Sequence, residues 1–232
     1  MGFHVNLLTL FPDMFPGFLG HSLAGQALER GDWSFDTVQI RDFGEGKHRN
    51  VDDTPFGGGA GMVMRADVIE RALLSVPCAG RKIYMSPRGK PLTQARVQEL
   101  SSENALTILC GRYEGVDQRI LDAHGFEEIS IGDYVLSGGE VAALTLMDAC
   151  IRLLPGVMGN ATTPDEESFS NGLLEYPHYT RPAEWTDANG VVRGVPDVLK
   201  SGNHAEIEKW RHAQSLQITQ LVRPDLLPKS GK

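Results

Sequence analysis

Short apolar runs alternate with segments of helical spacing over residues 1–154. The apolar or alternating runs at 5–11, 33–40, 82–85, 105–110 and 128–131 are typical of buried strands. Helical spacing lies between or after them, at 15–30, 65–76, 93–100, 116–123 and 140–154. Because strands and helices alternate, the pattern predicts an α/β fold, with a mostly parallel sheet and helices on both of its faces.

The character of the sequence changes after Leu154. The segment 155–172 is rich in Gly, Pro, Ser, Thr, Asn and acidic residues, which is typical of a linker or mobile loop. Helical patterns return near 204–214 and 215–222. We therefore predict a first domain at 1–158, a flexible linker at 159–175 and a small helical C-terminal domain at 176–232.

The formal net charge of the chain is −8, which argues against nucleic-acid binding because Lys and Arg supply most of the affinity for phosphate. Basic residues nevertheless cluster locally, and such a cluster is either a phosphate contact or a solvated face. The clusters are Arg41, Lys47 and Arg49, and then Arg81, Lys82, Arg88 and Lys90.

The cysteines and the apolar stretches bear on the cellular compartment of the protein. Cys78, Cys110 and Cys150 are an odd, widely spaced set without a CxxC pair, which favours reduced thiols over disulfides or a zinc site. No stretch approaches the ~20 apolar residues of a membrane span, and the opening segment lacks the features of a signal peptide. We expect a cytoplasmic protein without a membrane partner.

Two glycine-rich turns, CGRYEG at 110–115 and IGDYVLSGGE at 131–140, directly follow predicted strands. Because the carboxyl ends of parallel strands share one edge of a sheet, we expect the turns to form two walls of one small-molecule pocket. Tyr134, Val135 and Leu136 could hold a purine ring while main-chain groups read its edge. Glu140 has another reading, as an acid that complements a helix dipole.

A third glycine-rich segment, GGGAG at 57–61, could cradle a phosphate. It lacks the GK[ST] ending of a P-loop and the strand and helix context of a dinucleotide fingerprint. A loop that faces a substrate is the favoured interpretation, since glycines let backbone amides approach a ligand closely.

Five segments together resemble the bacterial tRNA (guanine-N1)-methyltransferase family, TrmD, of the SPOUT class. They are CGRYEG, IGDYVLSGGE, PFGGGAGM, LLEYPHYTRP at 173–182 and SGNHAEIEKWR at 201–211, and the match keeps its order from the first strand to about residue 225. The resemblance implies a deep trefoil knot towards the C-terminal side of the first domain. It also implies S-adenosylmethionine as the methyl donor, tRNA as the partner, a homodimer with its active sites at the subunit interface, and magnesium dependence, for which the sequence has no ligand motif.

The resemblance also assigns residues to the donor and the substrate. The expected donor-binding residues are Tyr84, Met85, Ser86, Pro87, Gly111, Tyr113, Glu114, Gly115, Ile131, Gly132, Asp133, Tyr134, Val135, Leu136, Gly138 and Gly139. The expected substrate-binding residues are Gly57, Gly58, Gly59, Glu175, Tyr179 and Arg181. Tyr179 and Arg181 suit base stacking and phosphate contact. No metal-ligating residues are expected, and His178 and His204 are interpreted as structural.

The implied reaction is methyl transfer to N1 of the guanosine immediately 3′ of the anticodon (position 37). That nitrogen carries a proton, so a base must remove it while developing charge on the ring oxygen is stabilised. By resemblance the base is Glu167 and its partner is Arg152, with Glu in place of the family's usual Asp. Glu166 could substitute as the base, DEE at 165–167 could be a solvated acidic stretch, and Arg152 could be a helix C-terminal charge.

Three other functions remain open from the sequence. A SPOUT enzyme of different RNA specificity would keep the donor loops but should lack the segments at 173–182 and 201–211. The hypothesis of a non-catalytic RNA-binding protein would explain the basic clusters, but it would leave the glycine-lined pocket without a ligand. A nucleotide-dependent metabolic enzyme would use 57–61 as a phosphate loop.

Overall fold

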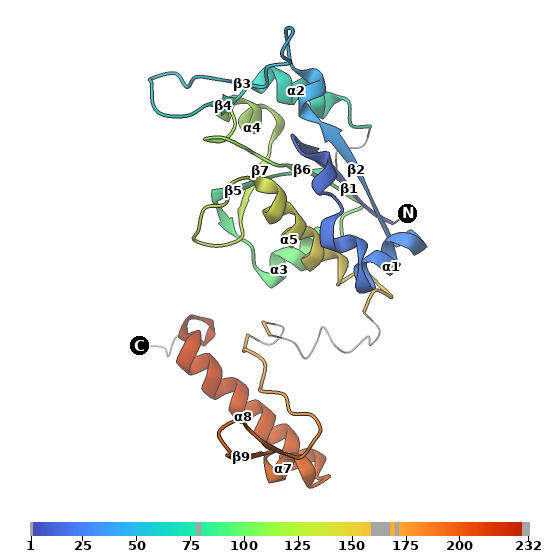
Figure 1. Cartoon of the computed structure of the whole chain (residues 1–232), viewed down its shortest axis with the longest axis vertical. Coiled ribbons are helices and arrows are strands. Elements are labelled where there is room, and N and C mark those ends of the chain that lie inside the picture. The colour runs from blue at the N-terminus through green and yellow to red at the C-terminus, as the bar shows by residue number, and fades with distance from the viewer. Residues whose placement is uncertain (1, 78–79, 159–167, 170–171, 229–232) are drawn as a thin grey trace. The chain divides into compact units, whose positions relative to one another are not determined.

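The computed structural model describes residues 2–77, 80–158, 168–169 and 172–228. The chain divides into two compact units, Met1–Gly159 and Asn160–Lys232 (Figure 1). Most of the predicted linker lies outside the described residues, and so does the proposed base Glu167.

The first unit is built on a five-stranded sheet in the order β2-β1-β6-β5-β7, and every neighbouring pair is parallel. Its strands are β1 (Phe3–Thr9), β2 (Trp33–Gln39), β5 (Arg81–Pro91), β6 (Ala105–Leu109) and β7 (Glu127–Ser130). The predicted parallel sheet is confirmed. The register of β5 against β7 shifts between Met85 and Lys90, both of which pair with Ile129, so β5 carries a bulge at the residues between them.

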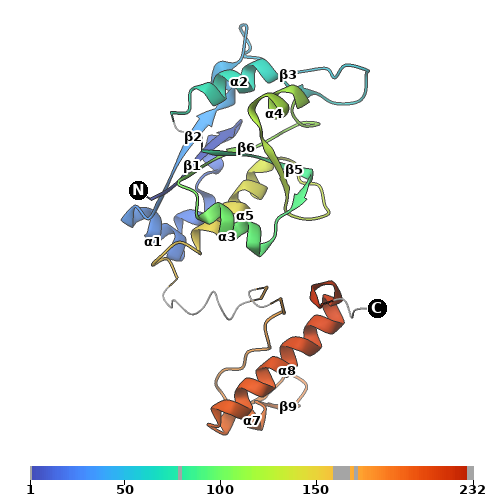
Figure 2. The same ribbon diagram turned by 180° about the vertical axis from the view of Figure 1, so that it is seen from behind.

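Helices cover both faces of this sheet (Figures 1 and 2). On one face lie α1 (Ser22–Arg30), α3 (Gln94–Ser101) and α5 (Gly139–Ile151), and on the other lie α2 (Ala66–Leu74) and α4 (Gln118–His124). Successive side chains of a strand point to opposite faces, so Leu7 packs with the first set and Leu8 with the second. The predicted helical cover on both faces is confirmed.

The single helix predicted at 15–30 is wrong. Two 3₁₀ turns, η1 (Pro12–Met14) and η2 (Gly17–Gly20), come before α1, which begins only at Ser22. Gly17 and Ser22 have φ of 56° and 54°, in the left-handed region that a continuous right-handed helix cannot include. The apolar spacing survives the break, because Leu19 of η2 and Ala27 of α1 are both fully buried.

Short elements that the sequence pattern did not predict precede α2. The 3₁₀ turn η3 (Ile40–Phe43) follows β2, and β3 (Asp52–Asp53) pairs with β4 (Val63–Met64) in an antiparallel ribbon. The loop that joins β3 to β4 carries Gly57, Gly58 and Gly59.

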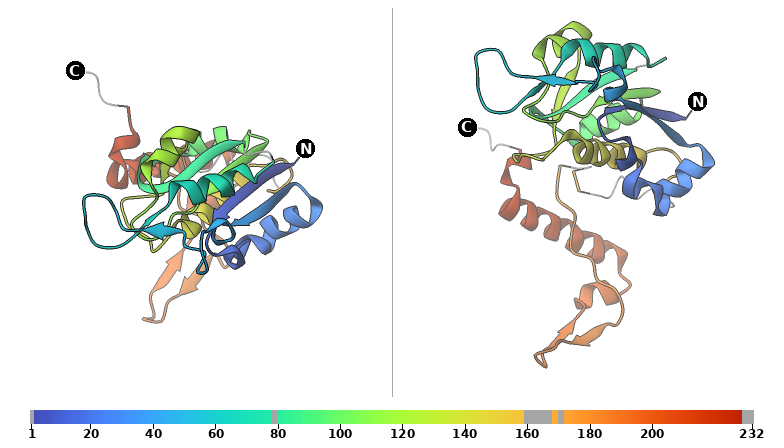
Figure 3. Two further views of the ribbon diagram at one scale, coloured as in Figure 1. Left: turned by 90° about the horizontal axis from the view of Figure 1, so that it is seen from above. Right: turned by 45° about the horizontal axis from the view of Figure 1, so that its top comes forward.

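The second unit contains an antiparallel hairpin followed by two helices. The hairpin joins β8 (Glu184–Thr186) to β9 (Val192–Gly194), and Figure 3 shows it as the paired arrows that precede α7 (Asp197–Lys200) and α8 (His204–Val222). A last 3₁₀ turn, η4, spans Pro224–Leu226. The two predicted helical segments are one continuous helix, because nothing at 214–215 breaks it and Thr219 donates a hydrogen bond to the Ser215 carbonyl 2.7 Å away.

Candidate functional site

A cavity of about 210 Å³ lies beside the bulge of β5, where β6 and β7 end. Three segments line it, namely 84–87 of β5 and the loops at 111–115 and 131–139, together with the first turn of α5. All of the donor-binding residues predicted from the sequence contribute to the lining except Asp133. The structure therefore gathers three segments that are far apart in the chain around one hollow.

Tyr84 closes the side of the cavity formed by β5. Its side chain is largely buried, which raises the pKa of its phenol. A Cβ atom added at Gly111 would lie 2.8 Å from the Tyr84 ring, so only a glycine lets the loop after β6 approach this ring. The close contact fixes the two loops against each other.

The loop after β7 leaves apolar side chains unpartnered beside the cavity. Its start is held by Ser130, whose hydroxyl donates to the Gly132 carbonyl at 3.0 Å, and the Tyr134 hydroxyl donates to the Ile131 carbonyl at 3.3 Å. Tyr134 is 54% exposed and Val135 is 84% exposed. Apolar surface next to ordered main-chain groups is what a heteroaromatic ring with polar edges requires.

Arg112 and Glu140 form an ion pair behind the cavity wall that was not among the predicted site residues. Arg112 Nε lies 2.9 Å from Glu140 Oε2, although the two atoms are not aligned as a hydrogen bond. The Thr9 hydroxyl donates to Glu140 Oε1 at 2.8 Å, and Arg112 Nη1 donates to the Ser137 carbonyl at 3.2 Å. Glu140 does lie in the first turn of α5, but it is fully buried and paired, which the helix-dipole reading did not include.

The loop that carries Gly57, Gly58 and Gly59 is anchored at its C-terminal end. At its base the Glu114 amide donates to the Met62 carbonyl at 2.9 Å, and the Met64 amide donates to the Gly115 carbonyl at 2.9 Å. The loop is therefore tied to one wall of the cavity. The three glycines all have positive φ, and a Cβ atom added at any of them would meet no heavy atom closer than 3.9 Å.

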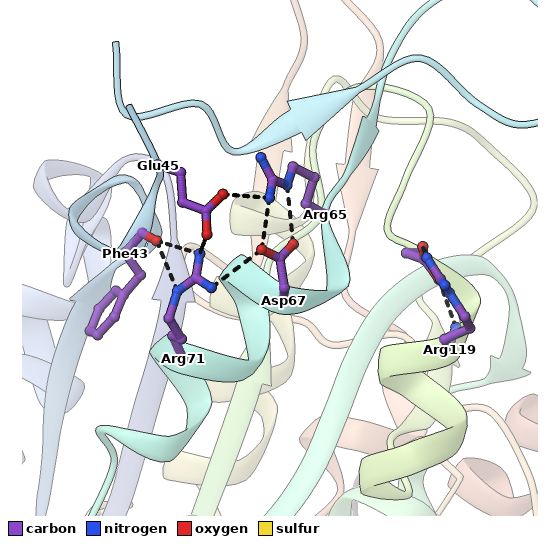
Figure 4. A network of polar contacts seen from close by, with 7 residues as sticks. Phe43, Glu45, Arg65, Asp67, Arg71 and Arg119 are labelled. Atoms are coloured by element: carbon purple, nitrogen blue, oxygen red, sulfur yellow. Dashed lines mark hydrogen bonds and ion pairs between the residues drawn. The ribbon is translucent and has the colours of Figure 1, made fainter. Parts of the chain in front are cut away.

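A network of charged groups holds the chain on either side of the β3–β4 ribbon (Figure 4). Arg65, directly after β4, donates to Asp67 at 2.8 Å and to Glu45 at 2.9 Å. Arg71 of α2 donates to the Phe43 carbonyl at 2.9 Å. Hydrogen bonding to Arg65 holds the pKa of Asp67 below its usual value. The network thus joins the segment before β3 to α2. In the predicted basic cluster, Arg49 pairs with Asp42 at 2.6 Å.

Arg152, the predicted partner of the base, does not line the donor cavity. It follows the last residue of α5 and lines a second hollow with Phe18, Leu23 and Asp148. The structure therefore does not bring Arg152 and the donor loops together around one cavity of a single chain.

The remaining predicted substrate residues lie in the second unit. His178 and Glu175 are 2.7 Å apart, and the ring of Tyr179 meets the ring of Trp210 edge-on with centroids 6.1 Å apart. Arg181 is exposed. The pairing of His178 agrees with its interpretation as a structural residue.

Within the described part of the chain, no three His, Cys, Asp or Glu side chains gather as metal ligands. Cys110 and Cys150 are free and buried. None of the described helices has the length and apolarity needed to span a bilayer.

Comparisons with known proteins agree with the sequence motifs. Residues 3–229 match the family model described as "tRNA (Guanine-1)-methyltransferase TrmD". A curated protein of Rhizobium johnstonii, named tRNA (guanine-N(1)-)-methyltransferase, is 59% identical over 100% of this chain and 93% of its own length. Proteins of the same name from Brucella ovis and Brucella melitensis are each 61% identical over 97% of this chain and 91% of their own length.

Proposed function

We propose the activity of this chain from the premise that it belongs to the TrmD family of tRNA (guanine-1)-methyltransferases. It transfers a methyl group from S-adenosylmethionine to N1 of the guanosine immediately 3′ of the anticodon (position 37) in tRNA. One observation carries the donor assignment. The three segments expected to bind the donor line one cavity beside the carboxyl ends of the parallel strands β6 and β7.

The cavity walls fit this donor. The loops at 111–115 and 131–139 offer main-chain groups for the edge of adenine, and Tyr134, Val135 and Leu136 offer exposed apolar surface for its faces. Gly111 and Gly132 let the backbone of these two loops lie directly against the rings of Tyr84 and Tyr134, where a Cβ atom would clash. When bound, S-adenosylmethionine supplies an electrophilic methyl group on a sulfonium sulfur.

The protein's part in the chemistry is a proton transfer and a charge stabilisation. We assign Glu167 as the base that takes the N1 proton of guanine, and Arg152 as the cation that stabilises negative charge on the guanine oxygen. Glu167 lies outside the described residues, so its assignment rests on the family resemblance. The described residues include no cluster of metal ligands, and magnesium has no part in this proposal.

A homodimer with shared sites is part of the proposal. Arg152 lines a hollow separate from the donor cavity, and this hollow is flanked by Phe18 and Leu23, which are 56% and 42% exposed. Exposed apolar side chains around a residue needed for catalysis support a contact with a second copy of the chain. In such a dimer, Arg152 of one subunit acts at the donor cavity of the other.

The deep knot is also a proposal, supported by how the chain leaves the edge strand β7. The amide of Gly139, at the start of α5, donates to the Gly111 carbonyl beyond β6 at 2.9 Å, and Glu140 reaches Thr9 at the end of β1. The chain therefore returns across the ends of two inner strands. Ordinary α/β connections do not thread through other loops, so this crossing is where a knot would form.

For the substrate, we propose that the Gly57–Gly59 loop and the second unit contact tRNA. The attachment of this loop to the wall formed by Glu114 and Gly115 supports a place near the reacting base. Tyr179, exposed beside Trp210, suits base stacking, and Arg181 suits phosphate contact.

The test uses labelled S-adenosylmethionine and tRNA transcripts that differ only at position 37. Label is expected in the transcript with guanosine at this position and not in one with adenosine, and digestion with mass spectrometry should locate the methyl group on N1. Donor binding is measured separately by calorimetry. Absence of donor binding in the presence of saturating tRNA would reject the methyltransferase assignment, whereas a label at another nucleotide would reject only the position.

A further inference from the structure

The ion pair between Arg112 and Glu140 is not explained by the assignments above. Glu140 is the only charged residue among the buried polar side chains of the described chain, and its side chain is 1% exposed. Burying a carboxylate costs several kcal/mol unless a partner compensates it. Arg112 is that partner, and it is also a lining residue of the donor cavity.

The contacts of Arg112 connect both walls of the cavity. The residue belongs to the loop after β6, yet its guanidinium donates to the Ser137 carbonyl in the loop after β7. Its guanidinium carbon lies 4.4 Å from the centre of the Phe11 ring. A Cβ atom added at Gly138 would lie 2.2 Å from Arg112 Nε, so the second loop packs directly on this side chain.

Glu140 fixes the same arrangement from the opposite side. It accepts from Thr9, whose hydroxyl in turn accepts a hydrogen bond from the Phe11 amide at 3.0 Å. The charge of Glu140 is thus held in place by β1, and Arg112 is held against it. Without the Glu140 carboxylate, the guanidinium of Arg112 would place an uncompensated positive charge beside the cavity. With the carboxylate, the pair has no net charge.

The sign of this charge matters for the ligand. S-adenosylmethionine carries a positive sulfonium, whereas its demethylated product, S-adenosylhomocysteine, carries a neutral thioether and the same amine and carboxylate. An uncompensated guanidinium would repel the donor more strongly than the product. The two ligands differ in charge at the sulfur and share their other groups. The ratio of their dissociation constants therefore reports the electrostatic potential of the cavity, because contributions common to both ligands cancel.

We propose that Glu140 is a positioning and charge-compensating residue of the donor site, which holds Arg112 between the two loops and cancels its charge, so that the cavity accepts a sulfonium ligand. This inference rests on the proposed donor. It assigns Glu140 a role in ligand discrimination that is separate from its role in stability.

The experiment measures the dissociation constants of S-adenosylmethionine and S-adenosylhomocysteine by calorimetry and compares their ratio among variants. Glu140→Gln keeps the shape of the side chain and removes its charge. We expect the ratio to shift against the sulfonium ligand by about tenfold, the order of effect of one uncompensated unit charge near a ligand at an effective dielectric of about 20.

Two controls separate charge from structure. Thr9→Val removes the hydrogen bond to Glu140 and leaves both charges, so both affinities can fall but the ratio should stay within about twofold of the wild-type value. Arg112→Met/Glu140→Gln removes both charges, and its ratio should also return to within about twofold of the wild type.

A Glu140→Gln variant that weakens both ligands equally would overturn the proposal in favour of a purely structural role. The same conclusion follows if the double variant keeps the shifted ratio of the single variant. If Glu140→Gln does not fold, the double variant decides, and a ratio changed by more than about threefold overturns charge compensation. Failure of the wild type to bind either ligand would instead reject the proposed function.

Discussion

The contact between the start of α5 and the end of β6 gives a quantitative test of how the donor cavity is built. At Gly139 an added Cβ atom would lie 2.9 Å from Cys110 Cα and 3.0 Å from the Gly111 amide nitrogen. Non-bonded carbon atoms normally approach to about 3.5–4.0 Å. Gly139→Ala must therefore push α5 away from β6 by roughly 0.5–1 Å, because Cys110 is itself held by the hydrogen bond from its amide to the Leu8 carbonyl at 2.9 Å.

Three contributions set the size of the effect. Overpacking of a close contact costs about 1–3 kcal/mol. Loss of the hydrogen bond from the Gly139 amide to the Gly111 carbonyl adds about 0.5–1.5 kcal/mol. Alanine is favoured over glycine in a helix by up to about 1 kcal/mol, which acts in the opposite direction. The middle of each range gives a fall in the free energy of unfolding of about 2.5 kcal/mol.

The assay is urea unfolding followed by circular dichroism at fixed protein concentration, with the donor dissociation constant measured on the folded protein. Gly20→Ala is the matched control, because its added Cβ atom would meet only the Pro16 side chain, at 3.4 Å. It should change the free energy of unfolding by no more than about 0.5 kcal/mol. Gly139→Ala should also weaken donor binding at least about tenfold, since the same displacement moves one cavity wall. If both variants unfold alike and bind donor alike, the close approach of α5 and β6 is not what shapes the cavity.

Three further predictions concern the dimer, the charged network and the thiols. If the sites are shared, two inactive variants, Arg152→Ala and Gly111→Val, should regain about a quarter of wild-type methylation after mixing and subunit exchange. No recovery in a sample shown to contain mixed dimers would place Arg152 and the cavity in one subunit. Because bonding to Arg65 lowers the pKa of Asp67, its stabilisation is complete above the ordinary aspartate pKa of about 3.9 and is lost as pH falls through the lower folded-state value. The difference in urea stability between wild type and Asp67→Asn should therefore shrink in acid, and a constant difference at about pH 2 would contradict this. Burial raises the pKa of the Cys150 thiol to about 12, so folded Cys78→Ser protein should not react with a thiol reagent at about pH 8 until urea unfolds it. Fast reaction without urea would refute burial as the protecting factor.

The five strands of the parallel sheet were predictable because each has a local signal. Residues 105–109 are apolar enough for a strand buried on both faces, and β6 occupies these residues. The break before α1 was not predictable from spacing, since Leu19 and Ala27 keep their apolar positions across it. The hairpin of the second unit had a signal that went unused. Asn189-Gly190 is a strong hairpin dipeptide, and Asp187 accepts hydrogen bonds from the Asn189 and Val191 amides at 2.9 and 3.0 Å.

The donor cavity and the ion pair behind it differ in what the sequence can reveal. Each glycine-rich turn follows its own strand, so a local reading finds both turns, and the parallel order of the strands then places them at one edge. No short sequence motif predicts the pairing of Arg112 with Glu140, because the pairing depends on how the chain crosses from β7 to the start of α5. From its neighbouring residues alone, Glu140 is interpreted as an acid at a helix N-terminus, and Arg112 as a polar residue in a turn. Only the crossing brings Arg112, Glu140 and Thr9 together. The residues most dependent on the topology of this fold are therefore those that local pattern reading overlooks.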